Sequence, residues 1–169
     1  GAAEFSLVYF RTDLQNLADF DFSRGYVNIG RARTRGVELS AEARVEKGPD
    51  LKLSYTRLEA LDLETGAPLP RRPKDKLAAD LAWAFASRWE AGISAVFTGP
   101  RPDRDYTAWP AADATLQSFL LLGARVSFDL GAGARAFLRL DNILGARAVT
   151  VFGYGAPGFT AAGGFRLGR

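Results

Sequence analysis

Apolar and polar residues alternate with a period of two along most of the chain. Over 76–85, for example, Leu77, Leu81 and Trp83 alternate with residues such as Lys76 and Asp80. Successive side chains of a strand point to opposite faces, so this pattern predicts strands with one apolar and one polar face. The pattern predicts eight strands: 37–45, 76–85, 89–98, 120–129 and 135–141, with weaker ones near 3–12, 51–55 and 159–167. Most span about ten residues, close to the ~9–11 with which a tilted strand crosses a bilayer.

The connections between these strands alternate between short and long. The short turns lie at 46–50, 86–88 and 129–133. The long connections, rich in arginine and aromatic residues, run roughly over 13–31, 61–75, 99–115 and 143–158. Transmembrane β-barrels have short periplasmic turns at one rim and longer extracellular loops at the other. Aromatic residues beside the short turns also fit an interfacial girdle; these are Phe85, Trp89 and Phe128.

The polar face of the predicted strands carries charges of both signs. We expect these residues to face the lumen of a barrel; they are Glu38, Glu42, Arg44, Asp80, Arg125, Arg139 and Asp141. In a soluble sandwich the same face would meet water, and periodicity alone does not choose between the two arrangements.

Composition removes several classes of function. The 169 residues include no cysteine and no histidine, which excludes disulfide frameworks, histidine-based zinc sites and Ser-His-Asp catalysis. The net charge of +3 is spread through the sequence and gives no nucleic-acid footprint. No apolar run approaches the ~20 residues of a membrane helix, and a mean hydropathy of −0.07 does not argue against a barrel. We expect no enzyme and no cofactor, and we interpret Asp103 and Asp105 as solvated loop charges.

One motif stands out in the first half of the chain, where residues 28–38 read N-I-G-R-A-R-T-R-G-V-E. Further pieces of note lie at 53–56, 66–73, 98–101, 140–145 and 152–158. In this order the series resembles the C-terminal end of a TonB-dependent outer-membrane receptor of the cobalamin-transporter (vitamin B12) type, and residues 28–38 are similar to the family's N-x-x-x-A-x-x-x-G-V-E strand. Gly36 suits a bulge or bend within the first motif, and Asn142 ends a strand where its side chain can satisfy freed backbone groups.

The resemblance implies an all-β fold of antiparallel transmembrane strands. Family receptors have 22 strands around an N-terminal plug, so residues 1–169 correspond to a C-terminal part of the barrel domain, without the plug and its TonB box. The family's last strand usually ends in an aromatic residue, whereas here the sequence ends Phe165-Arg166-Leu167-Gly168-Arg169. The implied location is the outer membrane of a Gram-negative bacterium.

The implied function is transport of a scarce metal chelate, cobalamin or a siderophore. The implied partners are membrane lipid, the plug, the remaining barrel strands and, through the plug, the TonB complex. Candidate ligand contacts lie on two extracellular loops: Arg101, Arg104, Tyr106 and Trp109 on one, and Phe152 and Tyr154 on the other.

Two alternatives remain at this point: a self-contained eight-stranded outer-membrane barrel, acting as an anchor or porin, and a soluble β-barrel that binds an apolar ligand. Pairing of Phe5–Tyr9 with Ala161–Phe165 would identify the closed small barrel. We expect instead an open arc of strands with an exposed apolar belt that requires detergent or lipid.

Overall fold

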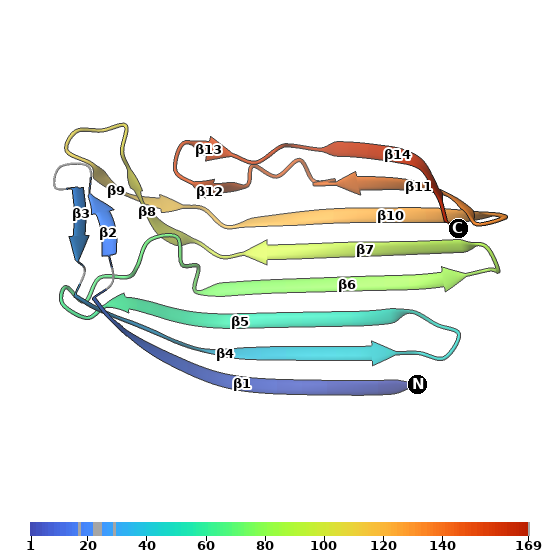
Figure 1. Cartoon of the computed structure of the whole chain (residues 1–169), viewed down its shortest axis with the longest axis horizontal. Coiled ribbons are helices and arrows are strands. Elements are labelled where there is room, and N and C mark those ends of the chain that lie inside the picture. Colours follow the sequence, from blue (N-terminus) through green and yellow to red (C-terminus); the bar gives the residue numbers. More distant parts are fainter. Residues whose placement is uncertain (17, 22–24, 29, 169) are drawn as a thin grey trace.

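The computed structural model describes residues 1–168 except 17, 22–24 and 29, and its main feature is one antiparallel sheet (Figure 1). The sheet has eight strands in the order β1-β4-β5-β6-β7-β10-β11-β14. Their bounds are β1 Ala2–Gln15, β4 Arg31–Arg44, β5 Asp50–Asp62, β6 Asp75–Phe85, β7 Trp89–Thr98, β10 Phe119–Gly131, β11 Ala134–Asp141 and β14 Thr160–Leu167. Within the described residues, no helix has the length and apolar character needed to cross a membrane.

The long connections contain short hairpins that the sequence pattern did not predict. β2 (Ala18–Asp21) pairs with β3 (Gly25–Asn28), β8 (Arg101–Asp105) with β9 (Ala112–Leu116), and β12 (Val149–Val151) with β13 (Tyr154–Gly155). These strands have two to five residues, too few for an alternating pattern to be recognised. β1 and β4 are also longer than predicted, at 14 residues each, so they extend beyond the length that crosses a bilayer.

The sheet is open at both edges. β1 and β14 are its terminal strands, and among the described residues Phe5–Tyr9 form no ladder with Ala161–Phe165. Both termini lie at the end of the sheet that carries the short turns (Figure 1). The interpretation as a self-contained eight-stranded barrel is therefore wrong, and the expected open arrangement is confirmed.

The strand register gathers the apolar side chains on one face, which we call the apolar face. One continuous row across six strands contains Leu7, Leu39, Tyr55, Leu77, Phe97 and Leu120. A second row lies beside the short turns, where the rings of Phe85 and Trp89 are 6.5 Å apart and those of Trp89 and Phe128 4.7 Å apart. No charged residue of the sheet lies on this face between the two rows. This uncharged zone is called the apolar belt below.

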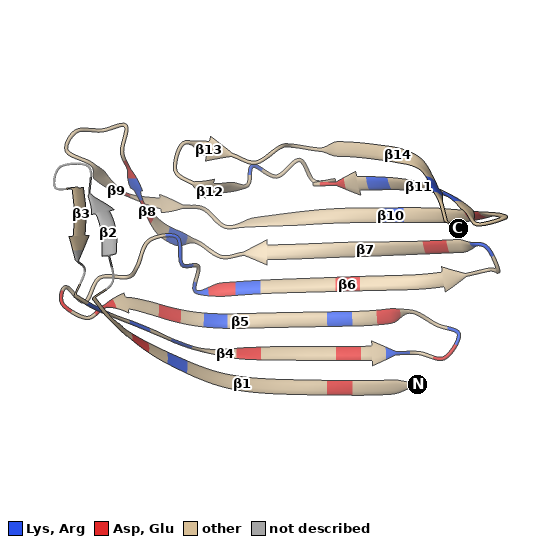
Figure 2. Cartoon of the chain, in the orientation of Figure 1, with Lys and Arg blue, Asp and Glu red and all other residues tan. Residues whose placement is uncertain are grey.

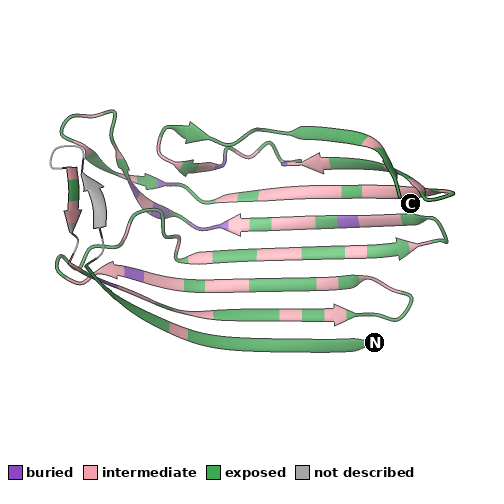
Figure 3. Ribbon diagram, in the orientation of Figure 1, coloured by how far each residue is buried: buried purple, intermediate pink, exposed green. Residues whose placement is uncertain are grey.

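The belt is not covered by any other part of the described chain. Leu81 is 37 % exposed, Leu138 44 % and Ile93 52 %, and the described residues include no large side chain that is fully buried. A soluble ligand-binding barrel would enclose these residues, so that interpretation is wrong as well. Apart from Gly92 on β7, the buried residues gather instead at the loop end of the sheet, with Ala32, Ala60, Leu116 and Ala148 as the apolar ones (Figure 3).

Gly36 lies in an unbroken ladder, so the bulge expected there is absent. It pairs with Phe10 on β1 and Leu58 on β5 without a register shift. A Cβ atom at this position would lie 2.3 Å from the carbonyl oxygen of Arg57 and 2.7 Å from the ring of Phe10. The glycine therefore allows close packing of the Phe10 ring across the strand.

Candidate functional site at the loop end

A buried carboxylate joins three of the long loops. The Asp103 side chain, on β8, is fully inaccessible to solvent. One of its oxygens accepts a hydrogen bond from Nε of Arg71 at 3.0 Å, and the other accepts one from the backbone N–H of Phe152 at 2.7 Å. Arg71 belongs to the connection between β5 and β6, and Phe152 to the connection between β11 and β14. One side chain thus links loops that are far apart in the sequence.

Arg101 strengthens the same junction. Its guanidinium donates hydrogen bonds to the carbonyl oxygens of Gly99, at 3.3 Å, and of Val149. It also lies 5.2 Å from the centroid of the Phe119 ring, within the range of a cation–π contact. Only 3 % of Arg101 is exposed, so the residue holds β12 against β8.

The electrostatics of the junction favour an ionised Asp103. Burial by itself raises the pKa of this carboxyl, but donors from Phe152, Arg104 and Arg71 outweigh burial and hold the pKa below its usual value. Burial also lowers the pKa of the Arg101 guanidinium, and the negative charge of Asp103 opposes that effect. The hydrogen bonds and opposite charges around Asp103 therefore keep the buried polar groups of the junction satisfied.

Asn142 organises the last loop, as the sequence predicted for this position. Its side-chain NH₂ donates to the carbonyl oxygens of Ala146, at 2.9 Å, and Pro157, at 3.2 Å. Its side-chain oxygen accepts from the backbone N–H of Ala146 at 2.9 Å. The residue is buried and has a φ of 50°, so its side chain replaces the ladder partners that the chain loses at the end of β11.

The remaining predicted ligand contacts are accessible at the loop end. Trp109 is 78 % exposed, Tyr154 74 % and Tyr106 42 %. Arg104 points away from the buried junction, since it follows Asp103 on β8, and it lies 3.6 Å from Asp113 across the β8–β9 hairpin. Phe152 is half-buried, and its backbone rather than its ring is bound to Asp103.

Asp103 and Arg71 have roles that the sequence pattern did not reveal. The interpretation of Asp103 as a solvated charge is wrong, because its side chain is inaccessible and fully hydrogen bonded. A signal was present: Arg101 and Asp103 are two residues apart and so share one face of a strand. The partner loops could not be deduced, since they lie about 30 and 50 residues away in sequence.

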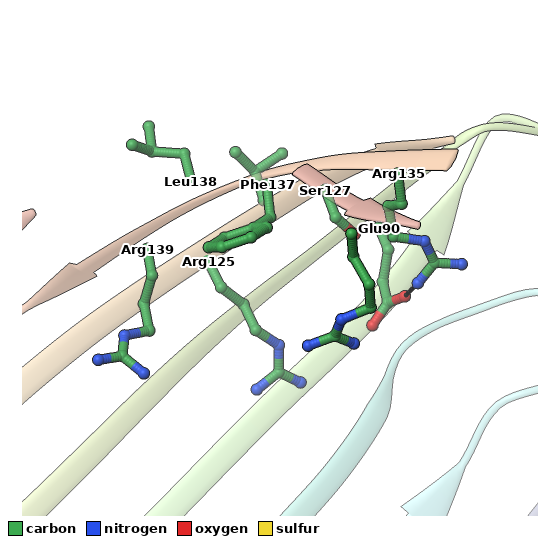
Figure 4. A pocket seen from close by; sticks show the side chains of 9 residues that line it. Glu90, Arg125, Ser127, Arg135, Phe137, Leu138 and Arg139 are labelled. Atoms are coloured by element: carbon green, nitrogen blue, oxygen red, sulfur yellow. Dashed lines mark hydrogen bonds and ion pairs between the residues drawn. The ribbon is translucent and has the colours of Figure 1, made fainter. Parts of the chain in front are cut away.

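A second cluster of charges lies on the polar face, near the short turns (Figure 4). Arg125, Arg139 and Glu90 project from one side of the sheet and Leu138 from the opposite side (Figure 4). Glu90 forms an ion pair with Arg135 at 3.2 Å, and Arg139 forms one with Asp141 at 2.9 Å. The cluster also contains Arg166. It borders a hollow of about 290 Å³ on the polar face.

The other charges predicted for the lumen share this polar face. Glu42 lies 3.3 Å from Lys52 on the neighbouring strand. Within the described part of the chain, Glu38, Asp80 and Arg125 form no ion pair. Instead, the Arg125 side chain extends over Gly92 of β7, where an added Cβ would come within 2.9 Å of Nε. The polar face of this sheet is therefore only partly neutralised by its own charges.

Comparison with known proteins identifies the class of this sheet. Residues 1–143 match the family described as TonB dependent receptor-like, beta-barrel. The chain belongs to this family, whose members are β-barrel proteins of the Gram-negative outer membrane. The structure and the comparisons thus confirm the predicted fold class, the outer-membrane compartment and the TonB-dependent receptor family, while the cobalamin-transporter type stays a prediction.

The fold is similar to solved receptors at low sequence identity. The ferripyoverdine receptor of the outer membrane of Pseudomonas aeruginosa is 17 % identical, with a TM-score of 0.81 over 98 % of this chain and 25 % of the receptor. A mutant of the ferric enterobactin receptor PfeA of P. aeruginosa is 19 % identical, with a TM-score of 0.73 over 94 % and 28 %. The copper transporter OprC is 16 % identical, with a TM-score of 0.75 over 94 % and 27 %. The chain spans about a quarter of the length of these proteins.

Proposed function

We propose that this chain forms the C-terminal wall of a TonB-dependent receptor that takes up a scarce metal chelate, a siderophore or cobalamin, across the outer membrane. The observation that carries the proposal is the open eight-stranded sheet with an apolar and a charged face. Unpaired edges in lipid leave backbone groups unsatisfied at several kcal/mol each, so such a sheet requires further strands to close a barrel. The proteins of similar fold are named as siderophore receptors and a copper transporter, which supports the transport class.

In this proposal the polar face lines the lumen and meets a plug. Glu38, Asp80 and Arg125 form no ion pair within the described chain, which suits a wall whose charges have partners on another domain. Burying unpaired charges against an apolar plug would be costly, so the plug surface should be polar and hydrated. Coupling to the TonB complex would then pass through the plug.

The exposed side chains of the loop end are the proposed ligand contacts. Trp109, Tyr154, Tyr106 and Arg104 offer aromatic faces and a guanidinium on a rigid support. The other two members of the predicted set, the buried Arg101 and the half-buried Phe152, act in this proposal by positioning the loops. A rigid junction keeps the exposed contacts in place and lowers the entropy lost on binding.

The proposal is tested with the complete receptor and a panel of ferric siderophores and cobalamin. Removing Trp109 (Trp109→Ala) should weaken binding of the transported chelate about 10- to 100-fold, in the range of an aromatic hot spot. The matched control is Trp83→Ala on the apolar belt, which should leave affinity unchanged. The proposal is overturned if the folded receptor binds no member of the panel, or if both variants bind like the unmodified protein.

A further inference from the structure

The hollow of about 290 Å³ on the polar face is bordered by arginines that repel one another. It is called the arginine hollow below, after Arg125, Arg135, Arg139 and Arg166. Strand register places Arg125 directly opposite Arg139, and Arg135 directly opposite Arg166. Like charges directly opposite each other on neighbouring strands destabilise a sheet. The fold therefore retains two unfavourable pairs at one place.

The carboxylates beside the hollow neutralise only one arginine of each pair. Arg135 is paired with Glu90 at 3.2 Å, and Arg139 with Asp141 at 2.9 Å. Asp129 is the register partner of Arg135, but it accepts a hydrogen bond from a backbone N–H of its own turn and does not line the hollow. No further carboxylate of the described chain pairs with these arginines.

The second arginine of each pair is left without a partner in the described chain. Neither Arg125 nor Arg166 forms an ion pair or a side-chain hydrogen bond there. Two guanidinium groups are thus directed at one hollow with their donors unused. A guanidinium binds a pair of anionic oxygens through two parallel hydrogen bonds, so an anion from outside the chain would relieve both repulsions.

An aromatic ring lies between the two arginine pairs. Phe137 follows Arg135 by two residues and precedes Arg139 by two, so all three share the polar face of β11 (Figure 4). Its ring lies across Gly164, where an added Cβ would come within 3.2 Å of it, and 39 % of the residue is exposed. An exposed ring flanked by guanidinium groups favours an anion that carries a planar aromatic group of its own.

The polar face of the first strands is built differently. Acidic residues are spread along β1, β4 and β5 (Figure 2). Arg44 lies directly opposite Asp50, and Lys52 lies between Glu42 and Asp80 in one row. That part of the wall can face a polar plug without a charged ligand. The arginine pairs are a feature of β10, β11 and β14, at the end of the sheet that carries the short turns.

We propose that the arginine hollow is an exit site, which binds a negatively charged aromatic metal chelate as it leaves the lumen on the side of the short turns. The inference rests on the proposed function, because it requires the polar face to line a transport lumen. The hollow lies at the opposite end of the sheet from the proposed ligand contacts of the long loops, so a chelate would reach it last.

The chemistry of the site defines the cargo. With the plug drawn aside, Arg125 and Arg166 would donate hydrogen bonds to catecholate oxygens, and Phe137 would stack against one aromatic arm of the chelate. Rings of arginine select anions in pores, and conduction requires such a site to bind weakly enough for release. The exit site would therefore lower the cost of moving a multiply charged anion through the lumen.

The test is uptake by cells that make the complete receptor. The probes are radiolabelled: the ferric complex of a hexadentate tris-catecholate, which is a trianion, the ferric complex of a trihydroxamate, which is neutral, and cyanocobalamin, which is also neutral. We expect uptake of the trianion. Arg125→Gln/Arg166→Gln should lower its maximal uptake rate about 10-fold, the effect of losing one charge-assisted hydrogen bond, without changing its affinity for the cell surface.

Two further variants isolate the role of the charges. Arg125→Lys/Arg166→Lys keeps both charges and should recover most of the uptake rate. Arg44→Gln/Lys76→Gln removes two positive charges from the polar face of β4 and β6, outside the hollow, and should transport like the unmodified receptor.

Denaturant unfolding separates an exit site from a structural role. The variant Arg125→Gln/Arg166→Gln removes one arginine from each like-charge pair, so its unfolding midpoint should stay equal or rise. Arginines that hold the plug in place would have the opposite effect: their loss would lower the midpoint and make receptor vesicles leak small solutes. Either of those results would overturn the inference.

The uptake results also separate the inference from the proposed function. An unchanged uptake rate in Arg125→Gln/Arg166→Gln, equal slowing in the control variant, or weaker surface binding at an unchanged maximal rate would overturn the exit site. Uptake of only the neutral chelates would overturn it too and would leave the proposed function intact. A receptor that takes up none of the probes contradicts the proposed function itself.

Discussion

The two faces of this sheet are built from alternate residues of the same strands, yet they differ completely in charge. On β6, Leu77, Leu81 and Trp83 belong to the apolar belt, while Lys76 and Asp80 point to the other side. The belt has no charge from the row of Leu77 to the row of Phe85, whereas the polar face carries charges along its whole length. A strand shifted by one residue would exchange the two faces, so the register itself determines which surface can meet lipid.

The difference also explains why the fold has so little buried core. A soluble protein is stabilised by side chains hidden from solvent, but here the large apolar side chains remain exposed on the belt. Lipid around the belt takes the place of a core. Burial is concentrated at the loop end, where the chain leaves the membrane and must organise its own polar groups.

Placing a charge on the belt gives the strongest test of the difference between the two faces. Leu81→Arg should destabilise the complete receptor by about 2–4 kcal/mol, the cost of an arginine near the bilayer midplane on the lipid face of a barrel. Asp80→Arg, one residue earlier on the polar face, should cost much less because that side chain does not face lipid. Unfolding in lipid vesicles by denaturant measures both variants. Equal destabilisation would contradict the assignment of the faces.

A second test concerns the tight packing around Gly36 between β1, β4 and β5. Gly36→Val places a Cβ against the carbonyl of Arg57 and the ring of Phe10, so we expect a loss of about 1–3 kcal/mol in unfolding free energy. Gly155→Val is a suitable control, because no atom lies within 4 Å of an added Cβ there. Denaturant unfolding of the two variants should differ clearly; similar midpoints would show that the contact is not tight.

A local effect, confined to the loops, is expected at the loop junction. Asp103→Ala leaves Arg71 and the N–H of Phe152 without their acceptor, at a cost of about 1–3 kcal/mol. Hydrogen exchange should therefore accelerate over 149–155 while the strands of the sheet keep their protection. Asp105→Ala is the control, because the described partners of its carboxylate, Thr107 and the backbone of Ala108, lie within its own turn. Unchanged exchange in Asp103→Ala would contradict the role of the junction.

The smallest expected effect is the pH dependence of the same junction. The folded pKa of Asp103 is lowered, so its contribution is complete above the ordinary aspartate pKa of about 4 and is lost as the pH falls through the lower folded value. Exchange at the backbone N–H of Phe152, corrected for intrinsic rates, should therefore rise in acid below about pH 4. Asp103→Asn should abolish this dependence. Persistence of the rise in that variant would assign it to another group.

Sequence reasoning predicted the sheet well because a strand's two faces alternate regularly over ten residues. The eight main strands, the three short turns and the unpaired edges follow from this periodicity and from family motifs such as 28–38. The hydrogen bonding of Asn142 to the backbone of the last loop was also predictable, because an asparagine side chain often ends a strand by bonding to a nearby turn.

The loop junction could not be predicted in the same way. Asp103 contacts Arg71 and Phe152 only after the sheet has brought three connections to one end. A five-residue strand such as β8 gives too short a pattern to distinguish its buried residues from exposed ones. Long-range contacts of this kind depend on the assembled sheet and not on local sequence.

The most direct test of the central claim is a spin-label scan of residues 76–85 in the complete receptor reconstituted in lipid vesicles. Each position is labelled in turn, and its accessibility to oxygen and to a water-soluble nickel chelate is measured. We predict a period of two, with oxygen accessibility high at Leu77, Ala79, Leu81, Trp83 and Phe85 and low at the intervening residues. Uniform access of the nickel chelate along β6, or a period of two with Asp80 in lipid, would contradict the account.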